Sequence, residues 1–141
     1  MRVLFVCTAN SARSQMAEAI ARHLQLWPDV KSAGLKPSGV NPLAIEVMAE
    51  MGVDMSSHTS KMLTPELLDW ADLVVTLCGD ARDSCPVLPR GKRHEHWGFA
   101  DPAQVSGSYE QKLGAFRAAR NAIKDRLVEE AISASSSGPE A

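Results

Sequence analysis

The chain has 141 residues, of which 45% are hydrophobic and 23% are charged, and this size and composition are typical of one soluble globular domain. Its formal net charge of -2 gives no general attraction to nucleic acid or to an acidic membrane, so any anion must be bound by a local site. No apolar run approaches the length of a membrane-spanning helix or of a signal peptide's apolar region, and we expect a cytoplasmic protein without nucleic-acid or membrane partners.

The predicted elements alternate between strands and helices. Continuous apolar residues predict buried strands over residues 2–7 and 73–77, and shorter strands are predicted over residues 30–35 and 94–99. Apolar residues at helical spacing predict helices over residues 14–27, 42–51, 65–70 and 109–131. Start signals precede the last three helices, and they are Asn41-Pro42, Thr64-Pro65 and a Ser108–Gln111 capping box.

The alternation predicts an α/β domain over residues 1–132, with a four-stranded parallel sheet covered on both faces by helices. The segment 79–93 is rich in Gly, Pro, Asp and Arg and is expected to be a mobile loop, and the Ser-rich tail from Ser133 is expected to be disordered. Ligands of such sheets bind beyond the carboxyl ends of the strands. Cys7 and Cys78 each follow a buried strand, so both are expected at that edge.

The segment Cys7-Thr8-Ala9-Asn10-Ser11-Ala12-Arg13-Ser14 lies between the first strand and the first helix. A loop of this length can wrap its backbone N–H groups around a tetrahedral oxyanion, with the positive end of the helix dipole behind them. The same field favours the thiolate of Cys7, and Arg13 can clamp two anion oxygens. The pattern indicates nucleophilic chemistry on a phosphate-like anion. The alternative is a tight turn that contains a buried cysteine.

The three cysteines are an odd number, which disfavours a structural disulfide framework and favours reactive thiols. Cys78 and Cys85 lie in one Gly- and Pro-containing segment and can pair after local rearrangement, which would give a relay with Cys7. In one alternative, Cys78 is a core residue and Cys85 an incidental surface thiol. In another, both bind zinc with His94 and His96, although this spacing is not a familiar zinc pattern.

Two other polar residues each have two interpretations. Asp101, before Pro102, is either a general acid that reaches the loop after Cys7 or an ordinary turn aspartate. His58, beside Thr59 and Ser60, belongs either to a supporting hydrogen-bond network or to a surface loop.

Taken together, these motifs resemble the low-molecular-weight protein tyrosine phosphatases, and most of all their thioredoxin-coupled arsenate reductase branch. The resemblance is carried by Cys-x5-Arg-Ser after the first strand and by Val-Thr-Leu-Cys before a loop that ends in Cys-Pro. Further matching stretches are Ser32-Ala33-Gly34, Gly39-Val40-Asn41-Pro42, His58-Thr59-Ser60 and His96-Trp97-Gly98-Phe99-Ala100-Asp101-Pro102. The similarity runs from the first strand to about Asp101 and continues weakly through the last helix.

The resemblance implies the reduction of arsenate to arsenite, with Cys7 as the nucleophile and Asp101 as the acid that protonates the leaving oxygen. It implies that Asn10 braces the loop and that Ser14 supports the thiolate. Phosphate or sulfate is expected to compete for the site. The residues that would bind the oxyanion are Thr8, Ala9, Asn10, Ser11, Ala12, Arg13 and Ser14.

The resemblance also implies a three-cysteine relay. Cys78 would attack Cys7 in the covalent arsenic adduct, release arsenite and leave a Cys7–Cys78 disulfide. Cys85 would then attack Cys78, and the resulting Cys78–Cys85 disulfide would be reduced by thioredoxin. Reduced thioredoxin is thus the expected electron donor, without a bound cofactor or metal.

The sequence departs from the family pattern at the position of a potassium ligand. Some members bind potassium through Asn10-, Glu18- and Ser32-like positions and an acidic residue, and that last position is Lys61 here. The Lys61 ammonium can take the place of the cation, so we expect no potassium dependence.

Two functions remain as alternatives, a small phosphatase whose extra cysteines are regulatory and a redox-controlled anion-binding module without turnover. The phosphatase branch typically has proline after Arg-Ser and aromatic residues near its Asp-Pro. This chain has Gln15 and Ala103 there, and its single tyrosine is Tyr109, which disfavours a phosphotyrosine substrate.

Overall fold

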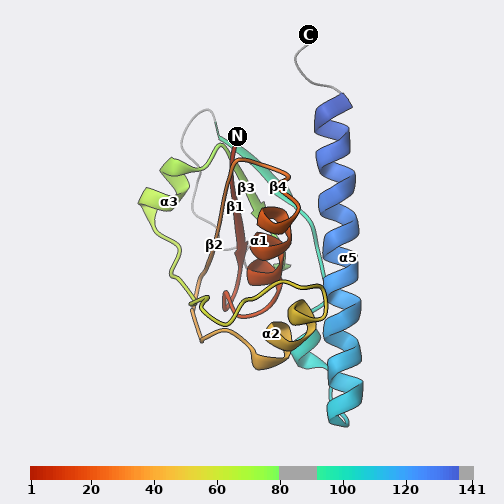
Figure 1. Ribbon diagram of the computed structural model, residues 1–141. Helices are drawn as coiled ribbons and strands as arrows, with labels where there is room; N and C mark the ends of the chain where they lie inside the picture. The colour runs from red at the N-terminus through yellow and green to blue at the C-terminus, as the bar shows by residue number, and fades with distance from the viewer. Residues whose placement is uncertain (80–91, 137–141) are drawn as a thin grey trace.

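The computed structural model describes residues 1–79 and 92–136. The described part of the chain folds around a parallel four-stranded sheet with the order β2-β1-β3-β4 (Figure 1). The strands are β1 (Arg2–Cys7), β2 (Asp29–Gly34), β3 (Leu73–Thr76) and β4 (Arg93–His96). The predicted α/β fold with a four-stranded parallel sheet is confirmed.

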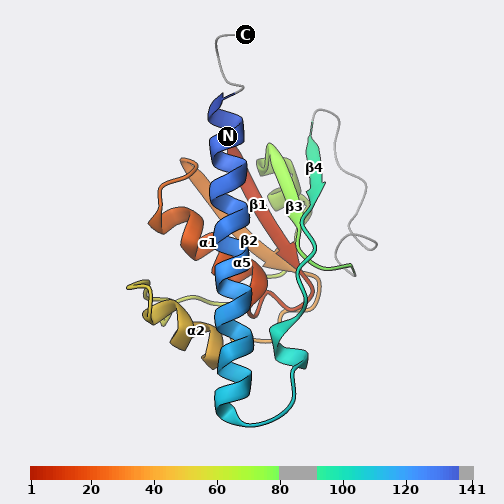
Figure 2. The ribbon, with the colours of Figure 1, turned by 90° about the vertical axis from the view of Figure 1, so that its right-hand side faces the viewer.

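Helices cover both faces of the sheet, as expected. α1 (Arg13–His23) and α5 (Tyr109–Ser136) lie over one face, and α2 (Pro42–Ala49) packs against α5 (Figures 1 and 2). The short helix α3 (Pro65–Trp70) lies on the opposite side of the sheet (Figure 1). A 3-10 turn, η1 (Pro102–Gln104), follows β4.

The hydrophobic core encloses β1 from Val3 to Cys7. Val3, Leu4, Phe5 and Val6 are all 0% exposed, which explains why this strand has a continuous apolar sequence rather than an alternating one. The ring of Phe5 packs 6.0 Å from the ring of Trp97, measured between centroids. Truncating a buried aromatic residue to alanine typically costs about 3–5 kcal/mol. This packing therefore stabilises β1, the strand that ends at Cys7.

The predicted helix start signals are confirmed. The side chains of Asn41 and Thr64 each accept a hydrogen bond from a backbone N–H in the first turn of the helix that follows. Ser108 and Gln111 exchange two hydrogen bonds, as a capping box requires. Local side-chain chemistry thus sets the first residues of α2, α3 and α5.

Helix and strand ends differ most from the predictions at α1, β4 and α5, and the other ends differ by two residues at most. α1 ends at His23 rather than near residue 27, because Gln25 adopts a left-handed conformation with φ 54° that stops the helix. β4 begins one residue earlier than predicted and ends at His96 rather than Phe99. α5 continues to Ser136, into the segment expected to be disordered, because each residue added to an existing helix gains one hydrogen bond.

Most of the predicted mobile loop 79–93 lies outside the described residues, as do Cys85 and residues 137–141. At the end of that loop, Arg93 belongs to β4. Within residues 1–79 and 92–136, no helix is both long and apolar enough to cross a membrane.

Candidate active site

A cavity of ≈ 620 Å³ lies where β1 and β3 end. It brings together four residues expected to act chemically, Cys7, Arg13, Cys78 and Asp101. Its other described lining residues are Thr8, Ala9, Ser11, Ala12, Ser38, Asn41, Gly79, Ala103 and Gln104. The predicted meeting of Cys7 and Cys78 at one sheet edge is thus present, whereas Cys85 lies outside the described residues.

Cys7 is the last residue of β1 and is 2% exposed. Its Sγ lies 2.8 Å from Oγ of the fully buried Ser14. Ser14 Oγ also accepts a hydrogen bond from Asn10 Nδ2 at 2.8 Å, which leaves the serine hydrogen available to the sulfur. When Cys7 is a thiolate, Ser14 is therefore its donor.

The loop between β1 and α1 is held in shape by Asn10. Asn10 adopts φ 46°, a left-handed conformation that asparagine tolerates better than most residues. Its Nδ2 also donates to Ser32 Oγ at 3.0 Å, and its Oδ1 accepts from the backbone N–H of Lys61 at 2.8 Å. A Cβ atom at Gly34 would lie 2.7 Å from the Asn10 nitrogen, so glycine is needed where β2 passes this loop.

Arg13 lies at the first position of α1, and its side chain contacts two residues of the segment that follows β4. Its Nη1 donates to the Phe99 carbonyl oxygen at 3.0 Å, and its Nη2 lies 3.6 Å from Asp101 Oδ2. Asp101 Oδ1 accepts from the backbone N–H of Ala103 at 3.0 Å. Asp101 therefore begins a turn, as one interpretation predicts, and also lines the cavity, whereas its role as a general acid stays a prediction.

Cys78 lies two residues beyond β3 and is 7% exposed. Its Sγ lies 3.1 Å from Thr8 Oγ1, which belongs to the loop after Cys7. The backbone N–H of Leu77 donates to the Val6 carbonyl oxygen at 2.9 Å, so the pairing of the two strands continues up to the thiols.

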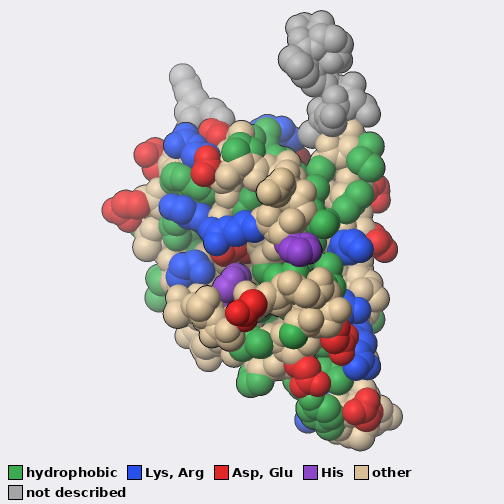
Figure 3. All heavy atoms as spheres, viewed as in Figure 1, with side chains coloured by type: hydrophobic (Ala, Val, Ile, Leu, Met, Phe, Trp, Pro, Cys, Tyr) green, Lys and Arg blue, Asp and Glu red, His purple; other side chains and the backbone are tan. Residues whose placement is uncertain are grey.

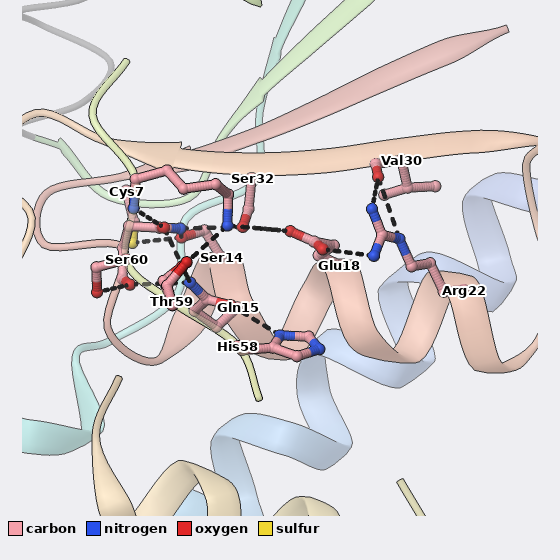
Figure 4. Close-up of polar contacts among 12 residues, drawn as sticks. Cys7, Ser14, Gln15, Glu18, Arg22, Val30, Ser32, His58, Thr59 and Ser60 are labelled. Atoms are coloured by element: carbon pink, nitrogen blue, oxygen red, sulfur yellow. Dashed lines mark hydrogen bonds and ion pairs between the residues drawn. The ribbon is translucent and has the colours of Figure 1, made fainter. Parts of the chain in front are cut away.

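Glu18 is a buried carboxylate behind the loop, and its side chain is 5% exposed. Ser32 donates to its Oε1 at 2.6 Å (Figure 4). Arg22 Nη1 lies 3.1 Å from Oε2, and Lys61 Nζ lies 3.8 Å from Oε1. Two cationic side chains therefore surround this carboxylate. These residues do not fit a potassium ion, because an ammonium group is present where an acidic ligand would be needed.

His58 belongs to a supporting hydrogen-bond network, one of its two predicted interpretations. Its Nδ1 lies 3.0 Å from Gln15 Oε1 (Figure 4). Burial is the main cause that lowers the pKa of His58 below 6.5. The charge of Glu18 opposes this shift, and the charges of Lys61 and Arg22 add to it. The ring therefore lacks a charge at neutral pH. It lines a groove of ≈ 480 Å³ with Arg22, Lys31 and Lys61, on the face where basic and histidine side chains gather in Figure 3.

Gln15 is the residue whose role the sequence did not reveal. It is fully buried in the first turn of α1, and its amide group contacts both the loop after Cys7 and the segment 58–60. From the sequence alone, Gln15 was notable only because the phosphatase branch typically has proline at this position. The sequence around Gln15 does not indicate which residues its amide group contacts.

The zinc alternative gains no support from the described residues. His94 Nε2 and His96 Nδ1 lie 3.0 and 2.9 Å from the hydroxyl oxygen of Thr76, so both rings are directed at a buried strand residue. Within residues 1–79 and 92–136, no group of three or more His, Cys, Asp or Glu side chains is placed to hold a metal ion.

Comparisons with known proteins agree with this fold. The chain is 48% identical over 126 residues to a Bacillus licheniformis protein named arsenate reductase, covering 89% of this chain and 91% of that protein. A solved structure described as an arsenate reductase in oxidized state is 35% identical, with a TM-score of 0.75 and coverage of 94% of this chain and 97% of that chain. Another, described as an arsenate reductase in the phosphate binding state, is 36% identical, with a TM-score of 0.70 and coverage of 94% and 98%.

A family model extends over nearly the whole chain and confirms the resemblance inferred from the motifs. The model describes the low molecular weight phosphotyrosine protein phosphatases and matches residues 2–133. The chain therefore belongs to the low molecular weight phosphotyrosine protein phosphatase family.

Proposed function

We propose that the protein reduces arsenate to arsenite and that reduced thioredoxin regenerates it. The observation that carries this proposal is a second buried thiol, Cys78, in the wall of the cavity that contains Cys7. Ester hydrolysis needs one nucleophilic thiol, whereas a two-electron reduction needs two thiols that can become a disulfide. The relatives named arsenate reductase support the same conclusion.

The cavity suits a small tetrahedral oxyanion. Its wall combines the loop after Cys7, the N-terminus of α1 and Arg13, and α1 begins without a side-chain cap at Ala12. Uncapped N–H groups and the helix dipole attract anions. None of the described lining residues is aromatic, and Tyr109 instead donates to Glu46 on α2, which disfavours a phosphotyrosine ring as the substrate. Phosphate and sulfate are expected to compete with arsenate.

In the first step, the Cys7 thiolate attacks arsenic and forms an S–As bond. A hydroxyl group leaves arsenic as water after it receives a proton, and Asp101, which lines the cavity, is the proposed donor. Arg13 holds the remaining arsenate oxygens. Arsenic is not yet reduced in this adduct.

In the second step, Cys78 attacks the sulfur of Cys7. The S–As bond breaks and leaves its electron pair on arsenic, so arsenite is released and a Cys7–Cys78 disulfide forms. Arsenic gains two electrons, and the two thiolates lose two. Cys85 then attacks Cys78, which regenerates the Cys7 thiolate and leaves a Cys78–Cys85 disulfide for the thioredoxin dithiol to reduce. The role of Cys85 rests on the family resemblance alone.

This chemistry needs no resident cofactor, because the electrons come from a dithiol partner. It requires a compartment that keeps thiols reduced, so we place the protein in the cytoplasm.

The experiment is NADPH oxidation by the reduced protein with thioredoxin and thioredoxin reductase, with and without arsenate. We expect oxidation that depends on arsenate and stops when Cys7, Cys78 or Cys85 is replaced by serine. Peptide mapping after one turnover should find Cys78 joined to Cys85. Arsenate-independent oxidation, or turnover that survives Cys78→Ser, contradicts the proposal.

The same variants separate the two alternatives. A phosphatase would lose phosphoester hydrolysis with Cys7→Ser and keep it with Cys78→Ser or Cys85→Ser. An anion-binding module would bind arsenate and consume no reductant. The family membership and the Arg13–Asp101 pair favour the phosphatase as the second candidate.

A further inference from the structure

Gln15 is a buried amide whose nitrogen and oxygen both have hydrogen-bond partners. Its side chain is 0% exposed, and its Nε2 faces three oxygen atoms. They are Asn10 Oδ1 at 2.9 Å, the Asn10 carbonyl oxygen at 3.2 Å and the Thr59 carbonyl oxygen at 2.9 Å. Amide nitrogen donates and amide oxygen accepts, so these three acceptors fix the orientation of the Gln15 side chain.

This orientation determines the tautomer of His58. Gln15 Oε1 can only accept, and it lies 3.0 Å from His58 Nδ1. His58 must therefore carry its hydrogen on Nδ1. With its pKa lowered by burial, the ring keeps this neutral form at neutral pH.

From Gln15, the hydrogen bonds run in one direction toward the nucleophile. Gln15 donates to Asn10 Oδ1, which leaves Asn10 Nδ2 to donate to Ser14 Oγ at 2.8 Å. Ser14 then directs its hydrogen to Cys7 Sγ at 2.8 Å. All four residues of this hydrogen-bond chain are buried. Buried polar groups strengthen one another's hydrogen bonds, and removing one partner leaves a buried group without its hydrogen bond, which is costly in free energy.

The left-handed backbone of Asn10 depends on the same contacts. Its carbonyl oxygen accepts from Gln15 Nε2 and from Ser60 Oγ, the latter at 2.7 Å. Gln15 thus holds both the backbone and the side chain of the residue that braces the loop. Figure 4 shows Gln15 between His58 and the hydrogen bonds around Ser14 and Cys7.

We infer that Gln15 is a positioning residue for the nucleophile, because it orients Asn10 so that Ser14 donates to the Cys7 sulfur. Gln15 also connects this chain of hydrogen bonds to the segment that carries His58. Gln15 does not touch the substrate in this role. The inference rests on the proposed role of Cys7 as a thiolate nucleophile. It predicts that Gln15 sets the fraction of Cys7 present as thiolate.

The test measures alkylation of Cys7 by iodoacetamide against pH in the fully reduced chain, with the modified peptide quantified by mass spectrometry. Gln15→Met keeps the length of the side chain and removes its hydrogen bonds. Gln15→Glu keeps the shape and places a carboxylate against three oxygen atoms. We expect the midpoint of the Cys7 profile to rise by about one pH unit and the rate at neutral pH to fall about tenfold in both variants.

Gln111→Glu is the matched control, because the introduced carboxylate still accepts from the Ser108 backbone N–H in the capping box of α5. It should leave the Cys7 profile unchanged. A wild-type Cys7 profile in both Gln15 variants, whatever their unfolding temperature, overturns the inference.

A second measurement needs no substitution. Nitrogen-15 NMR of the unmodified protein should find the neutral His58 ring with its hydrogen on Nδ1, and a hydrogen on Nε2 overturns the inference even if the variants do not fold. Neither readout uses arsenate or thioredoxin. A failure of the proposed reduction is therefore distinguishable from a failure of this inference.

Discussion

Thr8 Oγ1 lies 3.1 Å from Cys78 Sγ, although 70 positions separate the two residues. This contact joins the loop that follows β1 to the chain that leaves β3. The same loop surrounds the proposed substrate, so one hydroxyl links the substrate site to the second thiol. In the proposed relay, Thr8 stabilises Cys78 as the thiolate that attacks Cys7.

Thr8→Val removes this hydroxyl while it keeps the size of the side chain. We expect arsenate-dependent turnover to fall about tenfold, since a hydrogen bond to a charged group contributes about 1.5–3 kcal/mol. The rate of Cys7 alkylation should stay at its wild-type value, because Thr8 acts on the other sulfur. Thr8→Ser restores the hydroxyl and should restore turnover. Equal turnover in the Val and Ser variants contradicts this role.

Asp101→Asn tests the proposed proton donor. Asparagine keeps an oxygen that can accept from the Ala103 N–H, so the turn should persist. General acid catalysis typically contributes 10²–10⁴-fold, and we expect kcat to fall by at least about a hundredfold. Steady-state kinetics with arsenate measure this, and circular dichroism checks that the fold is kept. A variant with wild-type kcat would show that the proton comes from another group.

The Lys61 ammonium beside Glu18 predicts that the protein does not depend on potassium. Exchanging NaCl for KCl at constant ionic strength should change neither turnover nor the unfolding temperature. Lys61→Met leaves the buried carboxylate with the Arg22 ion pair and the Ser32 hydrogen bond. Because Lys61 is partly exposed, we expect a loss of about 1 kcal/mol, or roughly 2–4 °C. Activity of the unmodified protein that rises in potassium over sodium contradicts the assignment.

The lowered pKa of Glu50 predicts how the stability of the contact between α2 and α5 changes at low pH. Hydrogen bonds from Arg117 and Arg120 lower the pKa of Glu50 from 4.5 to about 2. A carboxyl group with a lowered pKa stabilises the folded state above its unfolded pKa, and this contribution disappears as the pH falls toward about 2.

Glu50→Gln should therefore lower the unfolding temperature above about pH 4.5, and its effect should shrink steadily as the pH falls through about 2. Thermal melts of both proteins across this range, followed by circular dichroism, measure the difference. Glu129→Gln, at an exposed position of α5, is the control and should leave the curve unchanged. A Glu50 effect that is independent of pH would show that the ion pairs contribute nothing.

The strands and the meeting of Cys7 and Cys78 were predictable from the sequence because both depend on local patterns. The apolar run before Cys7 identifies a strand buried on both faces, and the strand bounds of β1 match the prediction. Cys7 and Cys78 were predicted to meet because each follows such a strand, and parallel strands present their carboxyl ends together. The cavity contains both residues.

Some helix ends and the polar network were not predictable in the same way. Apolar residues continue to Trp27, but the chain turns at Gln25 and still packs Trp27 against Phe5, so the pattern overestimates the length of α1. The partners of Gln15 lie at Asn10 and at residues 58 and 59, and no spacing rule connects these positions. Such contacts depend on how separate elements pack.

The order of the strands has a consequence for how new chemistry arises on this fold. β1 and β3 are direct neighbours, and adjacent strands lie about 4.8 Å apart. A side chain just after the end of β3 therefore reaches the cavity that contains Cys7 without a change in the backbone. A single substitution just after β3 can therefore change which side chain faces the loop after Cys7, while the order of the strands stays the same.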